Sequence, residues 1–243
     1  MTKRHLVATA VFIITLLFTG GLQAQKWKTV TGSGSVVKKD FNLADFDGFT
    51  LAISAKVYLR QGNTQSVRIE AQQNIMDLLL TEVNDKHWKI RFESGVNVRQ
   101  YQPVRIYITI PTLTKAHITG SGDVIGEGTF TNLGNLSINI TGSGDLKLAV
   151  EAKDIEGKIA GSGDVKLDGS ANALSVSIAG SGDFVAAGLS VKNSTVRISG
   201  SGDCTADVSD TLDIQVSGSG SVRYKGQPKV NAKVSGSGSV RAI

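Results

Sequence analysis

Five aspartates recur at one place in a repeated turn, and they are the side chains of this sequence best suited to chemistry. Each follows a Gly-Ser-Gly tripeptide, and the set is Asp123, Asp145, Asp164, Asp183 and Asp203. Regularly spaced carboxylates are candidate ligands for calcium, which stabilises some β-roll repeats. The structural alternative is that each carboxylate accepts backbone N–H bonds at a turn. The structural interpretation is favoured, because Ser221 and Ser239 take the same place in the last two turns and serine is a poor calcium ligand.

Seven basic residues flank the same turns and define a predicted ligand face for an anionic glycan or surface polymer. Counted from the first glycine of each turn, one set lies five residues after it and the other lies three residues before it. The first set is Lys147, Lys166, Arg223 and Arg241, and the second is Lys158, Arg197 and Lys233. The alternative is that these side chains solvate the outer surface and compensate the row of aspartates.

Residues for catalysis are sparse, so we expect no enzyme activity and no bound cofactor other than the calcium considered above. The three histidines are His5, His87 and His117, too few for a histidine-rich metal site. The lone Cys204 falls at an inward position and is interpreted as a small core residue. Among the aromatic residues, Trp88 and Tyr101 are the candidates for stacking against a sugar.

The elements that position these residues follow from a repeat. Gly-Ser-Gly followed by Asp or Ser begins at seven glycines, 18 to 22 residues apart: Gly120, Gly142, Gly161, Gly180, Gly200, Gly218 and Gly236. Fixed turn residues at such a period are typical of a solenoid, in which one coil cannot bury its apolar side without its neighbours. We therefore predict an all-β fold, a right-handed parallel β-helix.

Apolar residues alternate with polar residues on both sides of each turn, which predicts two short strands per coil. Around Gly142 the expected inward residues are Leu136, Ile138, Ile140, Leu146 and Leu148. The coils around Gly180 and Gly218 repeat this pattern. The glycines supply the positive φ angles of the corner.

Residues 25–115 lack the short repeat but still read as β, and we expect them to continue the solenoid that residues 116–243 form. Residues 104–110 alternate as a strand, and apolar segments at 57–59 and 67–69 flank a turn. Asn74 is predicted to cap a short helix that runs through Leu80. A further Gly-Ser-Gly-Ser at residues 32–35 suggests another coil.

Residues 1–24 read as a secretory signal peptide, with a basic start at Lys3 and Arg4, an apolar stretch from Leu6 to Phe18, and a cleavage site after Ala24. The apolar stretch is too short to span a membrane, and no second one follows. Without the leader, 24 basic residues face 21 acidic ones. The charge is mild and unclustered, so nucleic acid is not an expected partner. We expect an exported protein, located in the periplasm or at the cell surface.

Taken together, these segments resemble a known family, the "putative auto-transporter adhesin, head GIN domain" family. The resemblance rests on the leader, the segment from Phe41 to Phe49, the stretch from Val57 to Gly62, and the Gly-Ser-Gly-Asp array. It covers nearly all of the chain that follows the leader. The resemblance implies a right-handed parallel β-helix in exported proteins of Gram-negative bacteria.

The leading functional hypothesis is an exported, non-catalytic binding or adhesion module of the bacterial cell envelope. It would contact a glycan or another surface component through a regular face of the β-helix. One alternative is a carbohydrate-active enzyme of the pectinase type. Another is a structural spacer that self-associates through the open strands at its ends.

Overall fold

A computed structural model of the 243-residue chain describes residues 28–99 and 102–243. The predicted leader at residues 1–24 and the candidate Tyr101 lie outside the described residues. Within these two ranges, no helix has the length and hydrophobicity that a membrane crossing requires.

The described residues form eighteen strands and one short helix. The elements before the regular repeat are β1 Lys28–Thr31, β2 Val36–Phe41, β3 Gly48–Leu51, β4 Ala55–Gln61, β5 Ser66–Gln72, α1 Gln73–Met76, β6 Val83–Asn84, β7 His87–Ile90, β8 Val96–Arg99 and β9 Val104–Ile110. Those of the repeat are β10 Lys115–Ile118, β11 Asp123–Gly142, β12 Leu146–Gly161, β13 Val165–Gly180, β14 Phe184–Gly200, β15 Cys204–Gly218, β16 Ser221–Lys225, β17 Lys229–Gly236 and β18 Ser239–Ala242.

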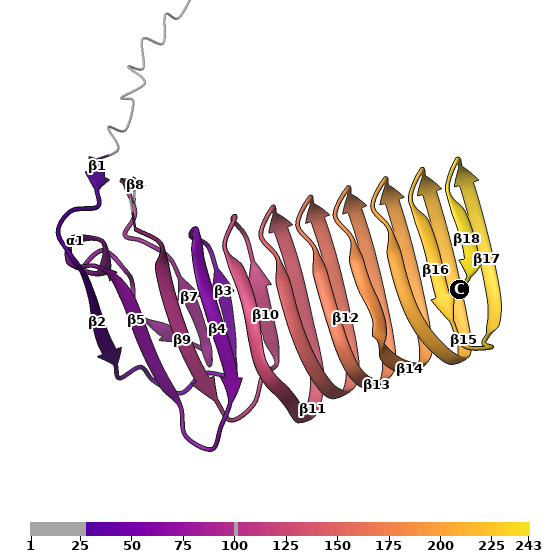
Figure 1. The fold of residues 1–243 in the computed structure, drawn as a ribbon, viewed down its shortest axis with the longest axis horizontal. Helices are drawn as coiled ribbons and strands as arrows, with labels where there is room; N and C mark the ends of the chain where they lie inside the picture. The colour runs from indigo at the N-terminus through magenta and orange to yellow at the C-terminus, as the bar shows by residue number, and fades with distance from the viewer. Residues whose placement is uncertain (1–27, 100–101) are drawn as a thin grey trace, which may run out of the picture.

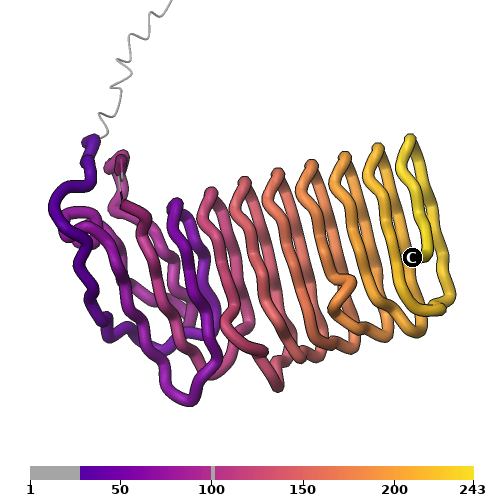
Figure 2. Tube along the Cα trace, viewed as in Figure 1, coloured from indigo at the N-terminus to yellow at the C-terminus, as the bar shows by residue number. Residues whose placement is uncertain are grey.

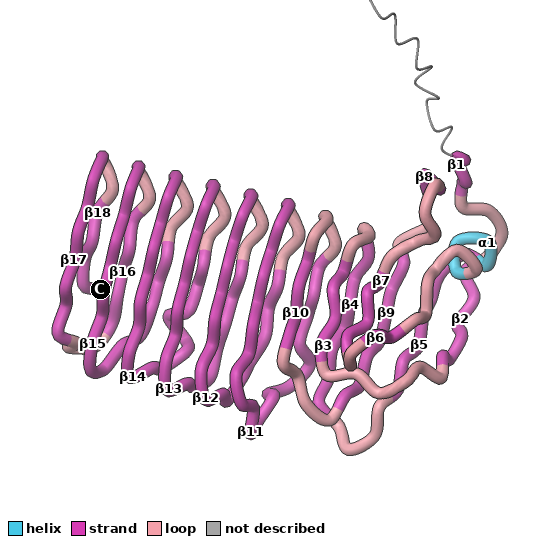
Figure 3. The backbone as a smooth tube through the Cα atoms, turned by 180° about the vertical axis from the view of Figure 1, so that it is seen from behind, coloured by secondary structure: helices cyan, strands magenta, loops and turns pink. Residues whose placement is uncertain are grey.

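The protein is a parallel β-solenoid of about seven turns, as the repeat predicts (Figure 1). Each long strand from β11 to β15 starts after one Gly-Ser-Gly corner, runs along one sheet to a bend at the opposite edge, and returns along the facing sheet to the next corner (Figure 1). All neighbouring coils pair in parallel, and like residues stack, with Gly142 beside Gly161 and Gly161 beside Gly180. The Gly-Ser-Gly corners consequently line one long edge of the molecule (Figure 3).

The inward positions expected from the alternation are buried. Leu136, Ile138, Ile140, Leu146 and Leu148 are each no more than 1% exposed. The equivalent residues around Gly180 are buried as well, and around Gly218 only Tyr224 is half-buried. The solenoid therefore has one continuous hydrophobic core, and burial of apolar area across the stack is its main source of stability.

From Gly142 onward, the backbone requires glycine at both glycine positions of each corner. Gly180 has a φ of 145°, a backbone conformation that side chains other than hydrogen disfavour. Gly163 is constrained differently, because a Cβ there would collide with the carbonyl oxygen of Gly144 in the preceding coil. Backbone bonds also join the corners, as Ser162 N donates to Gly142 O at 2.9 Å. The repeated tripeptide is thus a stacking requirement as much as a turn.

The stacking order of the first coils departs from the order of the sequence (Figure 2). The coil made of β3 and β4 lies between the coil of β7 and β9 and the coil of β10 and β11. The chain therefore passes from β9 over the β3–β4 coil to reach β10. A predicted boundary near residue 115 falls inside this sheet, since β10 pairs with both β3 and β11.

An irregular cap closes the N-terminal end of the stack. β5 pairs antiparallel with β9, and β2 pairs antiparallel with β5, so the sheet ends in strands of reversed direction. α1 and the β6–β7 hairpin cover the core there, and Trp88, Phe49 and Ile75 are buried within this end. The apolar segments at 57–59 and 67–69 do flank a turn, but β9 lies between their strands, β4 and β5.

Two expectations for this end are wrong. Residues 32–35 do not form a solenoid corner, because they link β1, which pairs with β8, to the antiparallel β2. Asn74 does not cap a helix through Leu80, because α1 ends at Met76 and its N-cap is Gln72. Asn74 instead binds Thr31 O and Ser33 N, which fastens the first segment to the cap.

The opposite end is open within the described residues. β17 pairs with β15 and β18 pairs with β16, and neither has a strand on its other side. β17 is exposed along its whole length, and Val230 and Val234 are 37% and 44% exposed.

Candidate functional site

The five aspartates form a ladder, and four of them, from Asp145 to Asp203, bridge to the next coil through the carboxylate. Asp145 Oδ1 accepts the N–H of Asp164 at 3.0 Å, and Asp164 Oδ1 accepts the N–H of Asp183 at 2.8 Å. Asp183 binds Asp203 in the same way, and Asp203 binds Ser221. The carboxylates therefore accept backbone N–H bonds, as the structural interpretation expects, but from the neighbouring coil instead of the local turn.

Among the described residues, one ion pair involves the second oxygen of these carboxylates, and it joins Asp203 Oδ2 to Arg223 Nη2 at 2.6 Å. Across residues 28–99 and 102–243, no group of three or more His, Cys, Asp and Glu side chains is gathered as a metal site. Calcium at the ladder remains a prediction, and the hydrogen bonds above account for the aspartates without it.

The seven basic residues are all exposed, but the strand register divides them between the two sheets. Lys147 and Lys166 are neighbours, as are Arg223 and Arg241, while Val185 and Thr205 separate the two pairs. On the facing sheet, a cation occupies every second coil, in the order Lys158, Ser177, Arg197, Gln215 and Lys233. The predicted ligand face is thus two interrupted rows on different sides of the molecule.

Cys204 and Trp88 are core residues. Cys204 is fully buried, and burial raises the pKa of its thiol to about 12, so it stays protonated at neutral pH. Trp88 is also fully buried, and its Nε1 donates to Leu80 O at 3.1 Å. The expectation for Cys204 is confirmed, whereas Trp88 cannot stack against a sugar.

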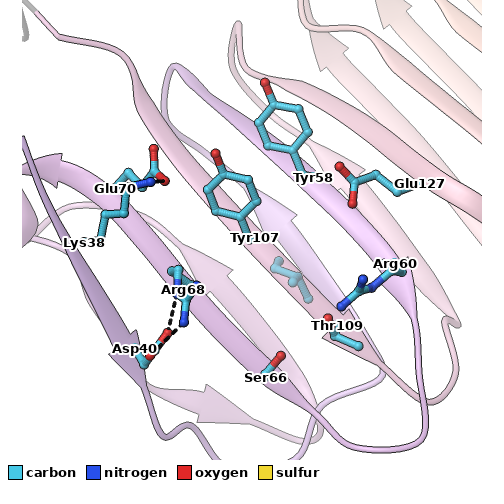
Figure 4. Close-up of a pocket in the computed structure, with 11 residues that line it drawn as sticks. Lys38, Asp40, Tyr58, Arg60, Ser66, Arg68, Glu70, Tyr107, Thr109 and Glu127 are labelled. Carbon is cyan, nitrogen blue, oxygen red and sulfur yellow. Dashed lines mark hydrogen bonds and ion pairs between the residues drawn. The ribbon is translucent and has the colours of Figure 1, made fainter.

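A surface hollow of about 620 Å³ brings together aromatic and charged side chains on the outer face of β2, β5, β9, β4 and β11. We call it the tyrosine hollow, because Tyr58 and Tyr107 lie at its centre (Figure 4). It is lined by Lys38, Asp40, Tyr58, Arg60, Ser66, Arg68, Glu70, Tyr107, Ile108, Thr109 and Glu127.

The two tyrosines are placed side by side by the crossover of the first coils. Each stands between buried aliphatic residues of its strand, so each ring faces outward. Tyr58 of β4 and Tyr107 of β9 are register partners, and their near-parallel rings have centroids 5.1 Å apart. Both hydroxyls point to the same side (Figure 4). The pKa of Tyr107 is raised, mainly by burial and then by the negative charge of Glu70. Its hydroxyl therefore stays protonated and can donate a hydrogen bond.

Ion pairs fix the side of the hollow that faces the cap. Arg68 donates to both carboxylate oxygens of Asp40, at 2.7 and 3.1 Å. This bidentate pair lowers the pKa of Asp40 and raises that of Arg68. Lys38 lies 2.7 Å from the buried carboxylate of Glu70, and Arg105 lies 3.9 Å from it.

The other side of the hollow carries one cation and one anion, Arg60 and Glu127. Arg60 of β4 and Glu127 of β11 are register partners and both are exposed. Neither takes part in an ion pair among the described residues. The side chain of Gln61 holds the two strands together here, since it binds Pro111 O, Thr131 O and Thr131 N.

The tyrosine hollow continues one of the predicted rows. Along the outer face the order is Asp40, Arg68, Tyr107, Tyr58, Ile125, Lys147 and Lys166. Sequence reasoning missed the hollow, although a tyrosine between two buried aliphatic residues is a signal of an outward ring. The sequence alone does not show that the two rings are neighbours, because residues 58 and 107 come together only through the crossover of the first coils.

A model of the family described as "Putative auto-transporter adhesin, head GIN domain" matches residues 45–228. Among solved structures, a "putative adhesin" from Bacteroides fragilis is 27% identical, with a TM-score of 0.84 over 88% of this chain and 100% of that chain. A "putative adhesin" from Parabacteroides distasonis is 25% identical, with a TM-score of 0.70 over 89% of this chain and 100% of that chain.

A "Putative lipid binding protein" from Parabacteroides distasonis shares the fold at 22% identity, with a TM-score of 0.70 over 89% of this chain and 100% of that chain. The curated proteins contain no match. These descriptions are consistent with a binding module, and the adhesin family implies an exported or surface protein. Since the family model spans residues 45–228, and the solenoid has the fold of the solved adhesins, the chain belongs to the family described as "Putative auto-transporter adhesin, head GIN domain".

Proposed function

We propose that this protein is a non-catalytic binding module of the bacterial cell envelope that holds a saccharide in the tyrosine hollow. The observation that carries the proposal is the pair of half-buried rings, Tyr58 and Tyr107, in an open hollow surrounded by hydrogen-bonding side chains. Aromatic rings pack against the C–H faces of sugars, while a few placed polar groups orient the hydroxyls. A volume of about 620 Å³ accommodates one or two sugar rings.

The location of the hollow supports contact with a polymer. It opens on the long outer face of the sheet, and the same row of outward side chains continues to Lys147 and Lys166. A glycan chain that leaves the hollow can therefore follow the solenoid axis over these cations. This retains a role for part of the predicted ligand face.

The charges of the hollow favour binding over catalysis. A glycosidase needs one carboxyl group with a raised pKa as its acid. Asp40 has the opposite property, because Arg68 lowers its pKa, and Glu70 is engaged by Lys38. Glu127 is the one lining carboxylate outside an ion pair among the described residues, and a single carboxylate does not supply the acid and base pair that such an enzyme uses. A carbohydrate-active enzyme of the pectinase type is therefore the less supported alternative.

The test is saccharide binding by the purified protein, measured on a glycan array and then by calorimetry. We expect the double variant Tyr58→Ala/Tyr107→Ala to lose at least about tenfold in affinity, which corresponds to about 1.4 kcal/mol. Val185→Ala is the matched control, since Val185 is an exposed apolar residue on the same face, remote from the hollow. Binding that survives the double variant, with its melting temperature unchanged, would refute the proposed site.

A second candidate function is self-association through the open terminal coil. β17 is exposed along its length, and a second copy of it can pair antiparallel about Ala232. In that register Val230 faces Val234, while Lys229 and Lys233 face Ser235 and Asn231 of the other copy, so like charges do not oppose each other. Open strand edges with apolar side chains are sites of such pairing.

Light scattering over a range of protein concentrations tests this second function. We expect a dimer that Val234→Lys dissociates, whereas Lys158→Ala on the same sheet leaves the dimer intact. A monomer at all concentrations up to about 1 mM, where a Kd of 1 mM is only about −4.1 kcal/mol, would rule out the pairing.

A further inference from the structure

The tyrosine hollow has no net charge, and this charge balance bears on the class of saccharide that it can bind. The lining contains three cations, Lys38, Arg60 and Arg68, and three anions, Asp40, Glu70 and Glu127. Four of the six are already paired with each other, in the Arg68–Asp40 and Lys38–Glu70 ion pairs. These four charges are satisfied within the protein and offer little net attraction to a charged ligand.

Arg60 and Glu127 are the two charges left for a ligand. They are opposed in the β4–β11 register, and Figure 4 shows Glu127 between Tyr58 and Arg60. An arginine only donates hydrogen bonds, and a glutamate carboxylate only accepts them. A sugar diol does both, so adjacent hydroxyl groups can accept from Arg60 and donate to Glu127 at once.

A sugar carboxylate would gain much less from the same two residues. Its attraction to Arg60 would be offset by repulsion from Glu127, because the two residues are register partners on neighbouring strands. An ammonium group on the sugar would be attracted to Glu127 and repelled by Arg60, so it would also gain little. Outside the lining, the next row carries Arg105, Lys56 and Asp123, which are two cations and one anion, so this row adds one net positive charge. Arg105 lies 3.9 Å from Glu70, which offsets part of that charge.

We propose that the tyrosine hollow selects an uncharged saccharide, with Arg60 and Glu127 gripping a pair of its hydroxyls beside the tyrosine rings. The inference rests on the proposed function, because it names the ligand class of that site. It also differs from the anionic glycan expected from the basic residues, since those residues lie outside the hollow's lining. Its basis is the charge balance of the hollow, not the overall basicity of the chain.

The experiment compares three probes with the purified protein: a neutral oligosaccharide series of gluco- and xylo-oligomers, oligogalacturonate as the acidic probe, and chitosan oligomers as the cationic probe. We expect the neutral series to bind best. Its affinity should not change between 50 and 500 mM salt, because screening affects only charged ligands. Arg60→Gln should weaken neutral binding about tenfold.

The decisive variant is Glu127→Gln, which gives the hollow one net positive charge. We expect this change to strengthen oligogalacturonate binding about threefold to fivefold, the effect of an exposed charge pair, and to make that binding salt-dependent. Glu151→Gln is the matched control, because Glu151 is an exposed glutamate of β12 outside the hollow. The control should leave all three affinities unchanged.

The outcomes separate the two proposals. If oligogalacturonate binds the native protein more tightly than the neutral series, and Tyr58→Ala/Tyr107→Ala abolishes that binding, the site stands and the selectivity inference is overturned. If binding by all three probes is absent or indifferent to the double variant, the proposed function fails and the inference falls with it. Neutral binding with the expected response to Glu127→Gln supports both.

Discussion

At the scale of single residues, the repeated aspartate is a connector between coils. Its carboxylate accepts an N–H from the next coil, with distances of 2.8 to 3.0 Å from Asp145 to Ser221. Stacked carboxylates repel each other at a strand spacing, so these bonds and Arg223 offset a cost that the ladder itself creates. Ser221 and Ser239 continue the row, with their hydroxyls 3.1 Å apart.

The calcium hypothesis can be tested at one of these residues. We expect Asp164→Ser to lower stability by about 1 kcal/mol, or roughly 2–4 °C in melting temperature, because one charge-assisted hydrogen bond is weakened. Calcium or EDTA should move neither the native protein nor the variant. Thermal unfolding at millimolar calcium measures both, and a rise of several degrees in the native protein alone would establish the ladder as a metal site.

At the scale of elements, the Gly-Ser-Gly corner decides how closely two coils approach. The second glycine faces the backbone of the preceding corner, and its hydrogen atom is all that the space allows. The serine between the glycines points to solvent. We therefore expect the corner to tolerate substitution of its serine and not of its two glycines.

Substitutions in one corner separate these roles. We expect Gly163→Ala to cost about 2–3 kcal/mol, because its Cβ would meet Gly144 O and Ile140, and the coils would have to part. Ser162→Ala should stay within about 0.5 kcal/mol of the native protein. Chemical denaturation measures both changes, and equal effects would contradict the proposed crowding.

A second element-scale feature is the pair of histidines where the cap meets the repeat. His87 of β7 and His117 of β10 lie with ring centroids 6.1 Å apart, and His87 binds Thr50 of β3. Burial lowers the pKa of both, with further lowering by Lys115 at His87 and by His87 and Lys115 at His117. Asp47 and Glu156 act in the opposite direction.

This pair predicts a loss of stability in mild acid. A histidine whose folded pKa is depressed binds more protons when unfolded, so its contribution is present above the unfolded pKa of about 6.5 and is lost below it. We expect the melting temperature to fall between pH 7.5 and 5.5. The variant His87→Gln/His117→Gln should show a smaller fall, and an equal fall would assign the pH dependence to other groups.

At the scale of the whole molecule, the solenoid is asymmetric, with a cap at one end and an exposed coil at the other. Each coil contacts only its neighbours, so stability is close to a sum over coils and their interfaces. The cap instead joins segments distant in sequence, since β3, β7 and β10 form one sheet from residues 48 to 118. A destabilising change should therefore lower the stability of the protein more at the cap than at the open end.

This asymmetry predicts different outcomes for two changes. A chain that stops at Gly226 lacks β17 and β18, and we expect it to fold and to melt only a few degrees lower. Trp88→Ala in the cap should cost about 3–5 kcal/mol, because it leaves a large cavity where Phe46 packs 5.7 Å from the indole. Circular dichroism melts compare the two, and the reverse ranking would contradict the nearest-neighbour description.

The sequence by itself determined the regular part of this protein. Inward residues such as Ile138 and Ile140, the corner at Gly142, and the buried Cys204 follow from local alternation and from the period, because in a solenoid the contacts of a residue are its own repeats one coil away. For the same reason, the aspartates could be predicted to stack. The family resemblance was also visible in these motifs.

Only the tertiary structure decided the cap and the site. The sequence pattern misplaces Asn74 and residues 32–35, because their partners, Thr31 for Asn74 and Gln72 of β5 for Gly34, belong to no repeat. Tyr58 and Tyr107 are 49 positions apart in the chain, yet the crossover of β9 makes them neighbours. Strand order depends on how distant segments bury their apolar faces together, and local residue patterns do not specify that order. The tyrosine hollow is therefore a product of topology.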